Sequence, residues 1–194
     1  MRRVHPKRVL GIVGSPRRGG NTEILLDEVL RGAQEAGARV GKVFLNDLDI
    51  APCQACGACE ETGECAQSDD MHSLLERMKR SDVWAFGTPV YWWGPSAQFK
   101  LFLDRWYCKA HRDEDRAMFK NRRIVVVIPF GDADPATARH TVGMFTDALN
   151  YMEAKLFAVI LAPGVNDPGD VRQHPDVMAA AYHAGQEAVK ESDE

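Results

Sequence analysis

The chain has 194 residues, of which 45% are hydrophobic and 27% are charged, and its formal net charge is −4. This composition is typical of a globular protein with enough apolar residues for one full core, so we expect a single domain over residues 1–194. The negative charge argues against a surface for nucleic acid or for an anionic membrane, and we expect neither partner.

The chain begins with a basic segment, but the apolar run that follows is too short for a signal peptide. No stretch has the roughly 18 consecutive apolar residues of a membrane-spanning helix. We therefore expect a cytoplasmic protein.

Short runs of β-forming residues alternate with longer runs of helical periodicity. The pattern predicts strands at residues 8–13, 40–45, 82–87, 123–128 and 155–161, with helices at residues 22–36, 71–79, 96–106, 137–152 and 175–190. Such alternation is typical of a parallel sheet with helices on both faces. Right-handed crossovers then favour a flavodoxin-like α/β fold, a three-layer sandwich with a five-stranded parallel sheet in the order 2-1-3-4-5.

The loop after the first predicted strand, Gly14-Ser-Pro-Arg-Arg-Gly-Gly-Asn-Thr22, suits an anion. Ligands of such sheets bind beyond the carboxyl ends of the strands, and glycines and helix N–H groups let a backbone surround a phosphate. Ser15, Asn21 and Thr22 add side-chain donors, and two arginines add positive charge. The lysine of a Walker A loop and the cysteine of a phosphatase loop are absent. We predict a phosphate monoester that is held and not transferred; an ordinary glycine-rich turn is the alternative.

The loop after the third predicted strand, Gly87-Thr-Pro-Val-Tyr-Trp-Trp-Gly-Pro-Ser96, contains three consecutive aromatic residues. They cannot all point into one core, so at least one should face a pocket or a partner. A phosphate at one strand end and a flat heteroaromatic ring at the next is the arrangement of FMN bound in such a fold. We therefore predict a flavin site; the alternative is that the aromatic residues pack under a lid or in a dimer interface.

Four of the five cysteines lie close together in the sequence, as Cys53, Cys56, Cys59 and Cys65. Clustered thiols form either a metal site or disulfides, and a reducing cytoplasm disfavours disulfides. The first three follow bacterial ferredoxin spacing, but the fourth comes two residues later and is followed by alanine instead of proline. Three hypotheses are open: a [4Fe-4S] cluster, a zinc ion, or thiols that are free or form adventitious disulfides.

Four motifs in this order resemble the NADPH-dependent FMN reductase family of flavodoxin-like proteins. They are the loop 14–22, the segment from Cys53 to Cys65 with Asp69-Asp70-Met71, the loop from Gly87 to Trp92, and Lys100-x3-Asp104-Arg105. The cysteine spacing resembles that of the iron–sulfur flavoproteins within this family. The match covers residues 8–106 motif by motif, and the cysteine-rich loop at about residues 47–70 forms an insertion.

The resemblance implies an FMN site. The expected cofactor-binding residues are Ser15, Arg17, Asn21 and Thr22 at the phosphate, Pro89, Val90, Tyr91 and Trp92 at the isoalloxazine, and Gly131 after the fourth strand. That last loop, Pro129-Phe-Gly-Asp-Ala-Asp-Pro135, departs from the family pattern. The resemblance also implies a homodimer or a homotetramer.

The expected function is that of an FMN-dependent oxidoreductase or electron-transfer flavoprotein. No catalytic side chain is assigned, because a flavin itself carries hydride and electrons. With a cluster at Cys53, Cys56, Cys59 and Cys65, electrons would pass singly to or from a ferredoxin-like protein. Without one, NAD(P)H would supply hydride and a small acceptor such as a quinone would take the electrons. The alternative is a non-enzymatic redox or metal sensor that uses the cysteine loop; it is less favoured because no effector domain is evident.

Overall fold

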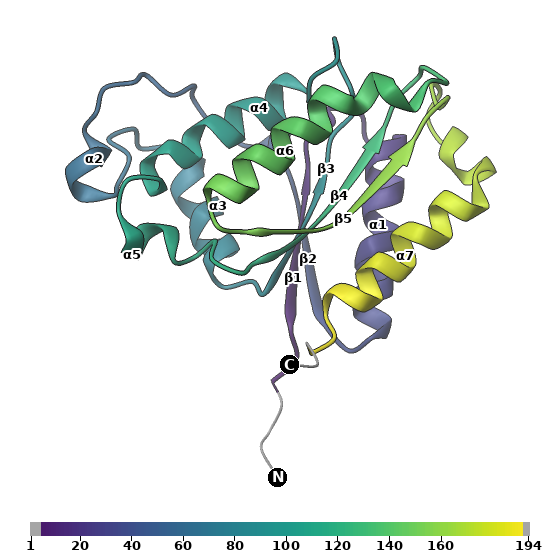
Figure 1. Cartoon of the computed structure of the whole chain (residues 1–194), viewed down its shortest axis with the longest axis horizontal. Helices are drawn as coiled ribbons and strands as arrows, with labels where there is room; N and C mark the ends of the chain where they lie inside the picture. Colours follow the sequence, from purple (N-terminus) through teal and green to yellow (C-terminus); the bar gives the residue numbers. More distant parts are fainter. Residues whose placement is uncertain (1–4, 192–194) are drawn as a thin grey trace.

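Five parallel strands form the central sheet of residues 5–191, the part of the chain that the computed structural model describes. Residues 1–4, which begin the basic segment, and residues 192–194 lie outside it. The strands are β1 (Arg8–Val13), β2 (Arg39–Phe44), β3 (Val83–Gly87), β4 (Arg123–Pro129) and β5 (Lys155–Ala162). Their order is β2-β1-β3-β4-β5, and every neighbouring pair is parallel (Figure 1). The predicted flavodoxin-like sheet is confirmed.

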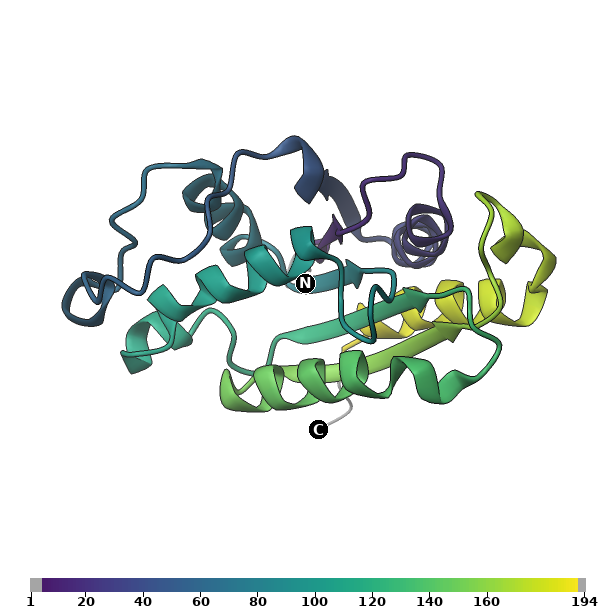
Figure 2. The same cartoon turned by 90° about the horizontal axis from the view of Figure 1, so that it is seen from above.

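Helices cover both faces of the sheet and complete the predicted three layers (Figures 1 and 2). One face carries α1 (Asn21–Glu35) and α7 (Pro175–Ala188). The other face carries α3 (Asp70–Lys79), α4 (Ala97–Asp104) and α6 (Arg139–Tyr151). The short helices α2 (Cys59–Thr62) and α5 (Asp113–Arg116) lie at one end of the molecule. Short 3-10 segments occur at Leu45–Asp47, Arg105–Lys109, Pro135–Ala138 and Asp170–Gln173.

The central strands β1, β3 and β4 are buried on both sides, since their side chains alternate between two apolar layers. In β3, Trp84 and Phe86 pack with α3, α4 and α6, whereas Val83 and Ala85 pack with α1. Successive strand residues point to opposite faces, so an uninterrupted apolar run fits a sheet covered on both sides. Each fully buried large side chain contributes roughly 1.5 to 3 kcal/mol. This core holds the carboxyl ends of the strands rigidly along one edge.

The helix predicted at residues 96–106 is α-helical only as far as Asp104. The chain then continues as the 3-10 segment Arg105–Lys109. Terminal helical turns often tighten in this way, and a tighter turn changes which side chains share a face. The segment brings Arg105 and Cys108 to the cysteine-rich loop, as described below.

The charged run at residues 111–116, for which the sequence suggests a solvated turn or a partner surface, contains α5. Arg112 pairs with Asp115 over 2.6 Å and Arg116 pairs with Asp113 over 3.1 Å. Because ion pairs three positions apart lie on one helix face, they stabilise this single turn.

No helix within the described residues is both long enough and apolar enough to cross a membrane.

Candidate functional site

A cavity of about 210 Å³ opens at the carboxyl ends of β1, β3, β4 and β5. It lies where the strand order reverses between β1 and β3, the position at which sheets of this topology bind ligands. The lining residues are Ser15, Arg17, Gly20, Asn21 and Thr22 after β1; Pro89, Val90 and Tyr91 after β3; Pro129, Phe130 and Gly131 at the end of β4; and Val165, Asn166 and Pro168 after β5. The fold thus gathers in one cavity all of the predicted cofactor-binding residues except Trp92.

The first turn of α1 contributes backbone N–H groups to this cavity. Gly20 precedes the helix, and no side chain caps the helix start. The N–H groups of a first turn have no partner within the helix, and the helix dipole adds partial positive charge there. The hydroxyl residues Ser15 and Thr22 are buried beside them. This wall of the cavity therefore favours an anion.

Arg17 is the charged residue among the described residues that line the cavity. Its Nη1 donates a hydrogen bond to the carbonyl of Asn166 over 3.2 Å. The adjacent Arg18 points elsewhere: it pairs with Asp47, and its guanidinium carbon lies 3.5 Å from the centre of the Phe44 ring. A guanidinium in a wall that contains no carboxylate again favours an anionic ligand.

The side chain of Asn21 joins the loop after β1 to the loop after β5. Its Nδ2 donates to the carbonyl of Asp167 over 3.0 Å. Its Oδ1 accepts from the backbone N–H groups of Gly169, over 3.0 Å, and Val171, over 3.3 Å. Asn21 therefore positions two walls of the cavity relative to each other, a role that the sequence pattern did not indicate.

The loops after β1 and β3 are joined around Gly14. Its N–H donates to the carbonyl of Gly87 over 2.7 Å, and its carbonyl accepts from Oγ of Ser96 over 2.5 Å. Ser96 also caps α4 by accepting a hydrogen bond from the N–H of Phe99. A Cβ at position 14 would lie 2.9 Å from the Phe99 side chain, so this close backbone approach requires glycine.

Trp92 and Trp93 form the tip of a two-residue hairpin. Tyr91 and Gly94 exchange two backbone hydrogen bonds, of 2.8 and 3.1 Å. Both tryptophans have positive φ angles, 49° and 60°, which glycine and asparagine adopt more readily. Trp92 is 91% exposed and lies outside the cavity wall, whereas Tyr91 is part of it. Two large apolar side chains are thus held beside the cavity by a strained turn.

The loop after β5 was not assigned from the sequence, although Asn166 lines the cavity. A Cβ at Gly131 would lie 2.1 Å from Oδ1 of Asn166, so the glycine leaves room for the Asn166 side chain against the loop after β4. In the sequence, the position of this loop is the one feature that indicates its place in the cavity wall. Pro163-Gly-Val-Asn166 follows the fifth strand, and the carboxyl ends of all strands of a parallel sheet lie at the same edge.

The four clustered cysteines line a second cavity, at the other end of α4 from the first. Its wall includes Cys53, Cys56, Cys59, Cys65, Arg105, Tyr107 and Cys108. Cys53 and Cys56 are exposed, Cys59 is buried, and all of the cysteines are free thiols. Among residues 5–191, no group of three or more His, Cys, Asp or Glu side chains is arranged to hold a single metal ion.

The thiols lie close enough to affect one another. Burial raises the pKa of Cys59, and the neighbouring thiols of Cys65, Cys56 and Cys53 raise it further. Burial raises the pKa of Cys108 to about 11, and Cys65 and Cys59 contribute in the same direction. The fold therefore gathers these sulfur atoms around one space.

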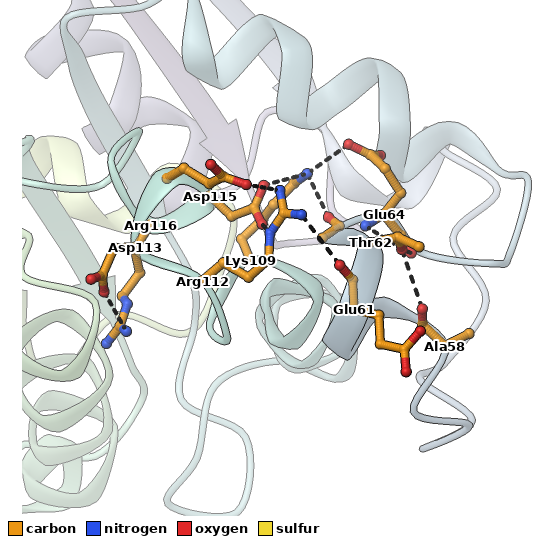
Figure 3. A network of polar contacts seen from close by, with 11 residues as sticks. Ala58, Glu61, Thr62, Glu64, Lys109, Arg112, Asp113, Asp115 and Arg116 are labelled. Atoms are coloured by element: carbon orange, nitrogen blue, oxygen red, sulfur yellow. Dashed lines mark hydrogen bonds and ion pairs between the residues drawn. The ribbon is translucent and has the colours of Figure 1, made fainter.

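Lys109 and Arg112, which follow α4, donate hydrogen bonds to the cysteine-rich loop (Figure 3). Nζ of Lys109 donates to the carbonyl of Gly63 over 2.8 Å and to the carboxylate of Glu64 over 3.1 Å. Nη1 of Arg112 donates to the carbonyl of Glu61 over 3.3 Å. Two parts of the chain that are far apart in sequence are joined in this way.

The fold and the first cavity define a flavodoxin-like protein whose site at the strand ends favours an anionic ligand. The model of the NADPH-dependent FMN reductase family matches residues 7–164. The chain belongs to this family.

Two proteins are similar to this chain in sequence, one over half of its length and one over most of it. An iron–sulfur flavoprotein of Methanocaldococcus jannaschii is 42% identical over 98 residues, which are 50% of this chain and 51% of that protein. YwqN of Bacillus subtilis, provisionally named an NAD(P)H-dependent FMN-containing oxidoreductase, is 28% identical over 178 residues, 90% of this chain and 94% of that protein.

Among solved structures, an NAD(P)H:quinone oxidoreductase from Methanothermobacter marburgensis matches with a TM-score of 0.76 at 22% identity. The match covers 98% of this chain and 100% of that one, and it shows a shared fold. The chain spans about half the length of the iron–sulfur flavoprotein that it matches.

Proposed function

We propose that the chain is an FMN-dependent oxidoreductase that takes hydride from NAD(P)H and passes electrons to a small acceptor. The observation that carries this proposal is the cavity at the strand ends. It combines an uncapped helix start and Arg17 in one wall with Tyr91 in another. Membership of the FMN reductase family and the likeness to YwqN support the same chemistry.

The residues of the cavity fit FMN. The hydroxyls of Ser15 and Thr22, the N–H groups at the start of α1 and the guanidinium of Arg17 would bind the phosphate dianion. Residues 89–91 would lie along the isoalloxazine, since a flat heteroaromatic ring favours apolar and aromatic walls. FMN, when bound, supplies the hydride and electron chemistry. The task of the chain is to bind and orient it, and we assign no proton transfer to a side chain.

We further propose that Cys53, Cys56, Cys59 and Cys65 bind a [4Fe-4S] cluster. In such a cluster each thiolate binds a different iron, so the sulfurs need not surround one ion. The space between these thiols is only about 20 Å³, and the exposed Cys53 and Cys56 would have to move outward on binding. Sequence similarity to iron–sulfur flavoproteins supports the proposal. Electrons could then be exchanged one at a time with a ferredoxin-like partner.

We also propose a homodimer or homotetramer in which the exposed tip formed by Trp92 and Trp93 contacts a second copy. Two exposed apolar side chains in a strained turn cost free energy. Burial of these side chains against another subunit would offset that cost. Sedimentation equilibrium of wild type and a Trp92→Ser variant tests this point. An unchanged oligomeric state in the variant would show that the tip does not contribute to the interface.

An anaerobic visible spectrum of freshly purified protein, with assays for flavin, iron, sulfide and zinc, tests both cofactor proposals. Flavin together with iron and sulfide is the expected result. Flavin alone, or flavin with zinc, would contradict the cluster proposal and leave the reductase proposal intact. If the protein binds neither flavin nor a cluster after reconstitution, both proposals are wrong. Steady oxidation of NAD(P)H by a quinone distinguishes an enzyme from a redox or metal sensor, which would show no turnover.

A further inference from the structure

Arg105 makes four hydrogen bonds from its two terminal nitrogens while being only 1% exposed. Nη1 donates to Oδ2 of Asp69 over 2.5 Å and to the carbonyl of Ala51 over 2.7 Å. Nη2 donates to Oδ1 of Asp69 over 3.1 Å and to Sγ of Cys65 over 3.3 Å. The guanidinium thus contacts both ends of the cysteine-rich loop and one of its thiols.

Stability alone does not account for this arrangement. A buried ion pair such as that of Arg105 and Asp69 adds little net stability, because the desolvation of two charges offsets their attraction. The Asp69 carboxylate satisfies one edge of the guanidinium fork, which leaves an N–H of Nη2 directed at Cys65. A thiol is a weak acceptor, whereas a charge-assisted hydrogen bond to a thiolate is strong. The geometry therefore directs a charged N–H donor at the Cys65 sulfur, as suits a sulfur that ligates a metal.

We propose that Arg105 is the positioning residue of the iron–sulfur site: it orients Cys65 as a cluster ligand and stabilises the reduced cluster through the N–H···S hydrogen bond. This inference rests on the proposed cluster. An N–H donated to a ligating sulfur, with a buried positive charge behind it, favours the more negative state and so raises the reduction potential. None of the other four cysteines accepts a hydrogen bond from an arginine or a lysine among those identified in the described residues.

The position of Arg105 does not depend on the cluster. Asp69 accepts hydrogen bonds from the N–H groups of Ala51, over 3.0 Å, and Met71, over 3.1 Å. These bonds hold the carboxylate at the start of α3, and the carboxylate holds the guanidinium. The Nη2 donor is consequently in place before a cluster binds, as expected for a preorganised outer ligand shell.

The inference requires arginine and not merely a positive charge. Only a planar fork can pair bidentately with Asp69 and still direct an N–H toward Cys65. The variant Arg105→Lys keeps the charge and loses the fork. Arg112 offers a matched control, since it also contacts the cysteine-rich loop but donates to a backbone carbonyl, that of Glu61, and not to sulfur.

The experiment compares the cluster midpoint potential, followed by EPR, in wild type, Arg105→Lys and Arg112→Gln, with flavin content as the measure of correct folding. We expect reduction of the cluster in Arg105→Lys to be about tenfold less favourable, which is about 59 mV for a one-electron couple. The Arg112→Gln value should stay close to wild type. Equal potentials in wild type and Arg105→Lys, or equal shifts in both variants, would overturn the proposal.

A second measurement needs no variant and so covers the case in which Arg105→Lys does not fold. Wild type grown with 15N-arginine is reduced, and electron–nuclear double resonance measures the coupling of arginine nitrogen to the cluster spin. A resolved coupling supports the hydrogen bond, and its absence overturns it. A wild type that contains flavin but assembles no cluster would overturn this inference and the cluster proposal, while leaving the FMN site intact.

Discussion

The hydroxyl of Ser96 donates a hydrogen bond to the carbonyl of Gly14, 82 positions away, over 2.5 Å. This bond joins the start of α4 to the loop after β1. The N–H of Ser96 in turn donates to Oγ1 of Thr88 over 3.0 Å. One buried side chain thereby sets the separation of the two loops that would hold the phosphate and the ring of FMN.

Replacing Ser96 by alanine should lower both stability and flavin affinity. The change removes the cap of α4 and leaves the buried carbonyl of Gly14 without its partner, a loss of roughly 1 to 3 kcal/mol in the free energy of unfolding. Urea unfolding and FMN titration measure the two effects. Ser73→Ala is the control, because the exposed hydroxyl of Ser73 only bonds the carbonyl of Asp70 within the same helix. That variant should stay within about 0.5 kcal/mol of wild type.

The two adjacent arginines should differ in their effect on FMN binding. Arg17→Gln removes the positive charge from the cavity wall and should raise the dissociation constant of FMN about tenfold, the loss of roughly one charge-assisted hydrogen bond. Arg18→Gln removes the same charge one residue away and should raise the dissociation constant less. The Arg18 side chain pairs with Asp47 and lies over Phe44, outside the cavity wall. Fluorescence titration of the apoprotein measures both. Equal losses in the two variants would show that only net charge matters.

The hairpin tip should be suboptimal for stability. The double variant Trp92→Asn, Trp93→Gly supplies the residues that this turn geometry favours, and we expect the free energy of unfolding to rise by roughly 1 to 2 kcal/mol. Thermal unfolding of the flavin-free chain measures the gain. A variant that is less stable than wild type as a monomer would contradict the assignment of strain.

Asp69 should make the stability of the chain depend on acid pH. Burial alone would raise the pKa of this carboxyl, but hydrogen bonds from Arg105, Ala51 and Met71 outweigh it and hold the pKa below its usual value of 3.8. The group therefore contributes stability that is fully present above this value and is lost as the pH falls through the lower pKa of the folded state.

The check is urea unfolding of iron-free wild type and Asp69→Asn between about pH 7 and about pH 3, the range over which a carboxylate of this kind titrates. The difference in free energy of unfolding should be constant near neutrality and should shrink below about pH 4. A difference that does not change across the whole range would mean that Asp69 has the same pKa in the folded and unfolded chains.

The five cysteines should react with iodoacetamide at different rates in the iron-free protein. Cys53 and Cys56 are exposed and should be alkylated first. Cys108 should react last, because it is buried and its pKa of about 11 leaves little thiolate at about pH 8. Peptide mass spectrometry over time gives the order, and the urea-unfolded chain, in which all should react alike, is the control. Early modification of Cys108 would contradict its burial.

The order of the sheet could be predicted from the sequence, since apolar runs such as residues 123–128 are separated by helical periodicity and few right-handed connections remain. The loop 14–22 could also be predicted to line the cavity, because glycines, hydroxyls and a helix start are local features. Trp92 shows the limit of this reasoning. An aromatic residue in the right loop was expected at the ring, but the hairpin turns it into solvent and leaves Tyr91 in the wall.

The sequence by itself therefore determined the fold class and two of the loops that line the cavity at the strand ends. Only the tertiary structure decided how those loops are held together: Asn21 bonded to the loop after β5, Ser96 to Gly14, and Arg105 to Cys65. These partners are 146, 82 and 40 positions apart. Secondary structure leaves a periodic signal over a few residues, whereas a hydrogen bond between distant loops leaves none until the sheet brings its strand ends to one edge.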